Sequence, residues 1–114
     1  MREPIRDKER LLHIEEAINQ IIEGHRSHSG TIKEGSLEYF GLVKLIEIIG
    51  EAVYKLTPGF KESHPNTPWR QIERMRHVLV HGYYTVGYEF IDEVIETDIP
   101  ILKSQIEQYL EELD

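Results

Sequence analysis

The segment from residue 73 to residue 84, ERMRHVLVHGYY, concentrates the residue types that move protons and hold anions. Imidazole is the side chain best suited to proton transfer near neutral pH. A guanidinium group can hold a phosphate through two hydrogen bonds and can stabilise charge that develops in a transition state. Arg76 and His81 therefore suggest phosphodiester chemistry. The phenol of Tyr83 could orient a phosphate oxygen or accept a covalent modification.

The spacing of these residues does not place them all on one stripe of a helix. Arg76 and His81 would lie about 140° apart, so a shared site needs the long reach of arginine, a loosened last turn or a second copy of the chain. His77 and His81 are four residues apart, a spacing that can ligate zinc. No third ligand is evident beside them, so we expect neither a metal nor a cofactor. An Arg-x4-His spacing is also common by chance, and a histidine near a helix end can simply interact with the helix dipole.

Polar residues at two other places in the sequence could have a functional or a purely structural role. Glu51 lies toward the end of an apolar helical segment. It either belongs to an exposed, helix-stabilising pair or is a carboxylate that positions Arg76. His25 and His28 flank a glycine-containing stretch, where we expect solvated loop residues.

Apolar residues recur at helical spacing along the chain, which predicts helices and no strands. The expected helices cover residues 5–23, about 36–56, about 69–83 and 88–113. Ser36 is a plausible N-cap of the second, and Thr67-Pro68 is a favourable start for the third. In the third helix we expect a core face made of Ile72, Met75, Val78 and Leu79. Asp98 and Pro100 restart or kink the last helix. Short connections between amphipathic helices predict an all-α, antiparallel bundle of four to five helices.

The composition describes one domain, residues 1–114, without cysteine, which excludes disulfides and thiolate metal sites. The charged N-terminus has no apolar core of a signal peptide, and no apolar stretch could span a bilayer, so we expect a cytoplasmic protein without membrane contact. Thirteen Lys and Arg against 21 Asp and Glu give a formal charge of −8. This acidity argues against generic binding of long nucleic acids, but not against a small site where a few cations hold one phosphate.

The sequence resembles the HepT-like branch of the HEPN superfamily. Arg76-x4-His81-x-Tyr83 matches its Rx4HxY motif. Three further segments resemble family segments in the same order, namely IIGEA at residues 48–52, PNTPWRQI at residues 65–72 and DIPIL at residues 98–102. The similarity covers about residues 5–113. One departure is His77, which stands where the family often has Asn or Asp.

The resemblance implies a helical homodimer and the toxin half of a toxin–antitoxin pair, acting as a metal-independent endoribonuclease on RNA. In that mechanism His81 is a general acid or base, Arg76 stabilises the phosphorane-like charge, and Tyr83 supports the site. Glu51 and His77 are expected as supporting residues. The resemblance also implies a minimal nucleotidyltransferase antitoxin that adenylylates Tyr83, which would add bulk and negative charge to the site.

A second interpretation gives the chain no catalytic activity. It would then be a HEPN module that binds a minimal nucleotidyltransferase partner or a nucleotide. A structural dimer without any site is the third.

Overall fold

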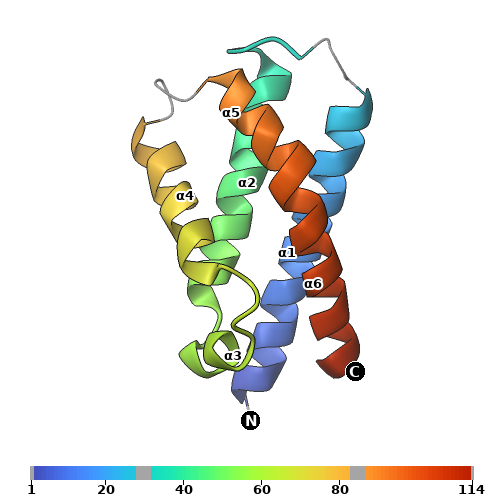
Figure 1. Cartoon of the computed structure of the whole chain (residues 1–114), viewed down its shortest axis with the longest axis vertical. Coiled ribbons are helices and arrows are strands. Elements are labelled where there is room, and N and C mark those ends of the chain that lie inside the picture. The colour runs from blue at the N-terminus through green and yellow to red at the C-terminus, as the bar shows by residue number, and fades with distance from the viewer. Residues whose placement is uncertain (1, 28–31, 83–86, 114) are drawn as a thin grey trace.

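The computed structural model describes residues 2–27, 32–82 and 87–113, with side chains from residue 6 onward, and its regular elements are all helical. In chain order they are α1 (Arg2–Ser27), α2 (Leu37–Lys55), α3 (Pro58–Ser63), α4 (Trp69–Gly82), α5 (Tyr88–Glu93), the π-helical turn η2 (Val94–Asp98) and α6 (Ile99–Leu113). Figure 1 shows α1, α2, α4 and the continuous α5–η2–α6 rod alternating in direction, with both chain ends at the same end of the bundle. The predicted all-α antiparallel bundle is confirmed.

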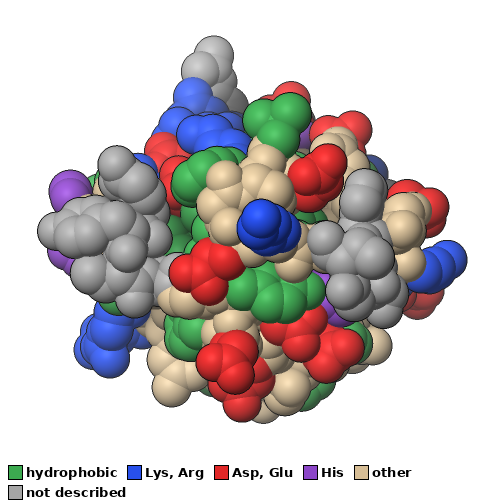
Figure 2. Space-filling model, turned by 90° about the horizontal axis from the view of Figure 1, so that it is seen from above, with side chains coloured by type: hydrophobic (Ala, Val, Ile, Leu, Met, Phe, Trp, Pro, Cys, Tyr) green, Lys and Arg blue, Asp and Glu red, His purple; other side chains and the backbone are tan. Residues whose placement is uncertain are grey.

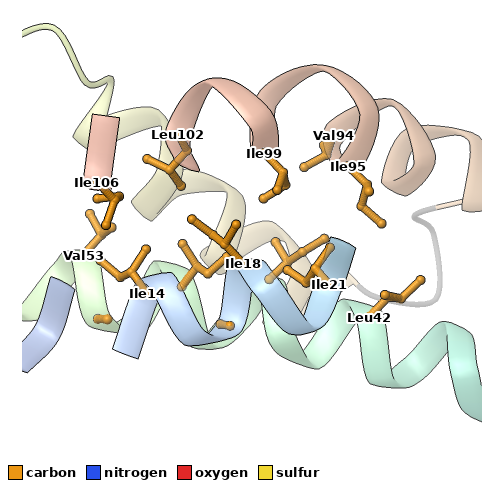
Figure 3. Close-up of a cluster of buried hydrophobic side chains, with 14 of the residues drawn as sticks. Ile14, Ile18, Ile21, Leu42, Val53, Val94, Ile95, Ile99, Leu102 and Ile106 are labelled. Atoms are coloured by element: carbon orange, nitrogen blue, oxygen red, sulfur yellow. The ribbon is translucent and has the colours of Figure 1, made fainter. Parts of the chain in front are cut away.

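The core lies where α1 is held between α2 and α6. The predicted stripe of α1 is fully buried at Leu11, Ile14, Ile18 and Ile21. Figure 3 shows these isoleucines directed at the apolar side chains of α2, η2 and α6. Burying each such side chain stabilises the fold by roughly 1.5–3 kcal/mol, so this three-helix contact is the main source of stability.

The first helix is longer than predicted. It continues through Gly24 and His25 to Ser27, although glycine is a weak helix former. The extra turn has a tertiary anchor, because His25 contacts Asp92 of α5. Tertiary contact therefore overrides local propensity here.

The start of α2 agrees with the prediction, whereas α3 was missed. Ser36 Oγ accepts a hydrogen bond from the backbone N–H of Tyr39. α3 begins with Thr57 as N-cap and Pro58 in the first turn, the same Thr-Pro signal that precedes α4. Buried Asp7 of α1 accepts hydrogen bonds from the N–H and the hydroxyl of Thr57, at 2.9 and 2.7 Å, and so fastens α3 to the bundle.

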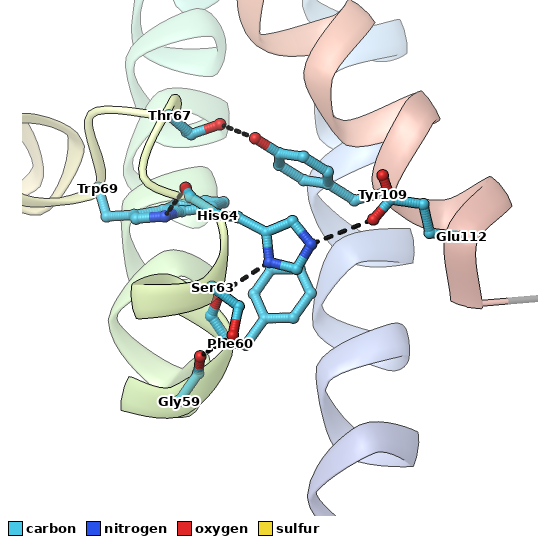
Figure 4. Close-up of polar contacts among 8 residues, drawn as sticks. All are labelled: Gly59, Phe60, Ser63, His64, Thr67, Trp69, Tyr109 and Glu112. Atoms are coloured by element: carbon cyan, nitrogen blue, oxygen red, sulfur yellow. Dashed lines mark hydrogen bonds and ion pairs between the residues drawn. The ribbon is translucent and has the colours of Figure 1, made fainter.

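The base of α4 is held by an aromatic and polar cluster against α6 (Figure 4). Trp69 Nε1 donates to the carbonyl of His64 at 2.9 Å, and Thr67 Oγ1 lies 2.7 Å from the hydroxyl of Tyr109. The His64 ring stacks on Phe60 with centroids 4.1 Å apart. Because these groups are mutually satisfied, the direction in which α4 leaves the base is fixed.

The predicted core face of α4 is only partly correct. Leu79 is fully buried, but Val78 is 43% exposed, and Ile72 and Met75 are half-buried. α4 packs chiefly against α2, so only a narrow stripe of it is covered. Ile72 and Met75 instead line an apolar hollow of about 190 Å³ next to Ile99 and Leu102.

The irregularity predicted near Asp98 and Pro100 is a π-helical turn. Proline has no N–H to donate to the carbonyl four residues earlier, so the α-helical ladder cannot run through Pro100 unchanged. The N–H of Ile99 donates to the carbonyl of Val94, five residues back. The rod thus continues without a break into α6.

Within the described residues, no helix is long and apolar enough to cross a membrane.

We predict that Gly50→Ala destabilises the protein, whereas Gly41→Ala in the same helix does not. An added Cβ at Gly50 would overlap Arg76 Cβ and lie 3.3 Å from the Ile72 carbonyl, while at Gly41 it would meet nothing within 4 Å. Overpacking costs about 1–3 kcal/mol, more than the roughly 1 kcal/mol that alanine gains over glycine in a helix. Urea unfolding of both variants measures the difference. Equal stabilisation by the two substitutions would contradict this account of the α2–α4 contact.

Candidate active site

Arg76 of α4 and Glu51 of α2 form the central ion pair of the site. Arg76 Nη2 lies 2.8 Å from Glu51 Oε1, with the side chains 37% and 40% exposed. Gly50 explains their closeness, since its missing side chain lets α4 approach α2 at Arg76. Glu51 also pairs with Lys55 at 3.4 Å, one turn further along α2. Glu51 therefore makes both of the contacts that the sequence left as alternatives. It forms a pair along α2 with Lys55, and its carboxylate holds Arg76.

The ion pair opens onto a groove of about 590 Å³ between α1, α2 and α4. Four lysine and arginine side chains, the imidazole of His13 and three carboxylates line this basic groove: Arg10, Lys44, Lys55 and Arg76, with Glu16, Glu47 and Glu51. In the described part of the chain, Arg10 Nε is a buried side-chain nitrogen without a hydrogen-bond partner. The groove thus carries a local excess of positive charge on an acidic protein.

His77 and His81 stand together on another side of α4. Their ring centroids are 4.5 Å apart, and both side chains are exposed. His81 lies in the last turn of α4, where a positive charge interacts favourably with the helix dipole. Among the described residues, no third His, Asp or Glu completes a metal-binding group with this pair.

The structure joins some of the predicted residues and separates others. Arg76 meets Glu51, and His77 meets His81, but the lining of the basic groove reaches Val80 and not His81. The angular separation expected of an ideal helix is therefore preserved within one chain. Tyr83 lies outside the described residues.

The expectation that His25 is a solvated loop residue is wrong. It belongs to α1, its side chain is 15% exposed, and its Nε2 lies 2.6 Å from Asp92 Oδ1. The partner is 67 residues away, so no local pattern around His25 could have indicated this contact. His28 lies outside the described residues.

The chain belongs to the Ribonuclease HepT-like family, whose model matches residues 14–109. This confirms the HepT-like resemblance that the motif and its neighbouring segments indicated.

Named relatives come from bacteria and archaea. "Putative RNase TTE0752" of Caldanaerobacter subterraneus is 44% identical over 60% of this chain and 62% of its own length. "Probable ribonuclease HepT" of Thermococcus cleftensis is 39% identical over 60% of this chain and 63% of its own. "Putative RNase MJ1380" of Methanocaldococcus jannaschii is 30% identical over 85% and 90%. The chain thus spans less than two thirds of the first two relatives. No solved structure matches it.

We predict that Glu51→Gln changes the free energy of unfolding by less than about 1 kcal/mol, because partly exposed ion pairs contribute little to stability. Urea unfolding of Glu51→Gln beside Lys55→Gln, which removes the other partner of Glu51, measures this effect. A much larger loss in Glu51→Gln alone would show that the Arg76–Glu51 pair is a structural element of the bundle.

Proposed function

We propose that this chain is a metal-independent endoribonuclease toxin. The RNA 2′-oxygen attacks the adjacent phosphorus, the bond from phosphorus to the 5′-oxygen breaks, and the products are a 2′,3′-cyclic phosphate and a 5′-hydroxyl. A general base takes the proton of the 2′-hydroxyl, and a general acid returns one to the leaving 5′-oxygen. The observation that carries the proposal is Arg76, held by Glu51 at the edge of a basic groove in a HepT-like chain.

Arg76 is suited to stabilising the charge that develops on the phosphorane. Glu51 fixes one edge of the guanidinium, and the side chain remains 37% exposed. A guanidinium has five N–H donors, so groups not engaged by Glu51 can bind phosphate oxygens. Arg10, whose side chain lines the same groove, is a candidate contact for a neighbouring phosphate.

His81 is the proposed general acid or base, with His77 as a supporting neighbour. Both rings are open to solvent, so a substrate can reach them. Because His81 and Arg76 lie on different sides of α4, we place the reaction in a cleft shared by two chains of a homodimer. Val78 and Val80, which are 43% and 39% exposed on α4, support such a contact.

Control by a minimal nucleotidyltransferase antitoxin completes the proposal. The enzyme would transfer AMP to the phenol oxygen of Tyr83, with pyrophosphate leaving from ATP. The added phosphodiester is negatively charged and bulky, so it would repel RNA from a site built around Arg76. The ribonuclease names of the relatives support the nuclease activity, and the Rx4HxY resemblance supports the regulation.

We predict that the purified protein cleaves RNA in the presence of EDTA and leaves cyclic-phosphate ends. Arg76→Ala and His81→Ala should each reduce cleavage by about 100-fold or more, since each removes charge stabilisation or proton transfer from the transition state. Arg70→Ala, which removes an exposed arginine from the first turn of α4, is the matched control and should retain activity. Circular dichroism checks that each variant remains folded.

Full activity in either Arg76→Ala or His81→Ala would overturn the mechanism. No cleavage by the wild type, together with tight binding of a nucleotidyltransferase, would instead favour the partner-binding module.

We predict that a cognate nucleotidyltransferase adds one AMP per chain, measured by intact-protein mass spectrometry. Tyr83→Phe should abolish the addition, because it removes the acceptor oxygen, while Tyr84→Phe should retain it. The adenylylated protein should no longer cleave RNA. Modification that persists in Tyr83→Phe would place the acceptor elsewhere.

A further inference from the structure

A second polar cluster lies where the last turn of α1 meets the junction of α5 and η2. It consists of His25, Asp92 and Glu96, and none of these residues lines the basic groove. One ligand atom from each lies within 4.8 Å of the other two. Figure 2 looks onto this end of the bundle and shows Asp and Glu side chains over much of it, several of them in the lower half.

Tyr88 lies beside the cluster and contacts Asp92. Its hydroxyl donates to Asp92 Oδ1 at 3.1 Å, and the same oxygen lies 2.6 Å from Nε2 of His25. The two carboxylates of the cluster favour a cation over an additional anion.

We propose that His25, Asp92 and Glu96 bind a divalent transition-metal ion of the zinc class. Zinc lies about 2.0–2.2 Å from imidazole nitrogen and carboxylate oxygen, so ligand atoms around a tetrahedral ion are about 3.3–3.6 Å apart. Atoms already within 4.8 Å of one another can reach a common ion by small side-chain rotations. A water molecule would complete four-coordination at this partly open site.

The ligand types discriminate among metal ions. Calcium and magnesium prefer sets of oxygen ligands, whereas an imidazole nitrogen favours zinc and its neighbours in the transition series. His25 is therefore the residue that selects the class of ion. The carboxylates of Asp92 and Glu96 would balance the charge of the bound ion.

The backbone at this place is irregular in a way that suits a binding site. Glu96 lies within the π-helical turn η2, and Asp92 lies in α5 just before it. Such turns are rare and occur frequently at functional sites. Here the turn follows α5 directly and carries one of the two carboxylates of the cluster. A bound ion would replace the single contact between His25 and Asp92 with three bonds joining α1 to α5 and η2.

The test uses untagged protein stripped with a chelator and titrated with Zn²⁺ by calorimetry and with Co²⁺ by visible absorption. We expect one ion per chain at micromolar affinity, with a thermal midpoint that rises by roughly 5 °C or more in excess Zn²⁺. His25→Gln and Glu96→Gln should each weaken binding by about tenfold or more. Glu96 is exposed, so its variant keeps the test valid if His25→Gln does not fold.

Two other histidine variants serve as controls. His13→Gln removes an exposed histidine of α1, and His77→Gln breaks the competing pair with His81, so both should bind the ion as the wild type does. No binding below millimolar Zn²⁺, binding unchanged in Glu96→Gln, or binding lost in His77→Gln would overturn the proposal. Because the cleavage assay is run in EDTA, its outcome and this one are independent.

Discussion

The close approach of α2 and α4 at Gly50 is the constraint on which the candidate site depends. With a side chain at that position the helices would separate, and Arg76 would no longer stand beside Glu51. Gly50 and Glu51 are consecutive residues. The same turn of α2 therefore allows α4 to pack closely and supplies the carboxylate that pairs with Arg76 of α4. This gives a physical reason for the IGEA segment. Gly50 allows the short distance between α2 and α4, and Glu51 forms its ion pair with Arg76 across that distance.

The local charge of the basic groove matters more to a phosphate than the net charge of −8. At physiological ionic strength the Debye length is about 8 Å, so distant carboxylates are largely screened. Within the groove, four cations face three carboxylates, and Arg76 and Lys55 share Glu51. A phosphate that enters can therefore compete with Glu51 for cations that are already positioned. This arrangement favours short contacts with a few phosphates over broad binding along a nucleic acid.

Sequence periodicity predicted the bundle because each long helix buries a stripe that repeats with the helical turn, as Ile14, Ile18 and Ile21 do. The prediction that Val78 belongs to the core was wrong. The width of the buried stripe depends on how many helices pack against α4, and α4 packs chiefly against α2. α3 was missed although Thr57-Pro58 repeats the signal used for α4. The pairing of Arg76 with Glu51 could be stated only as one of two alternatives. The role of His25 could not be predicted, because its partner belongs to a helix 67 residues away.

The attachment of α4 explains how one flank of this helix stays exposed. At its base, Trp69 and the Thr67–Tyr109 contact fix α4 to the rest of the chain, and along its length Gly50 and Leu79 seat it on α2. The opposite flank, with His77, Val78 and His81, is left exposed because no further helix of the described chain covers it. This flank combines two imidazoles with one exposed valine, and the proposed second chain would contact it. The same packing that holds Arg76 in the groove thus turns His81 outward, which is why the proposed site draws on two chains.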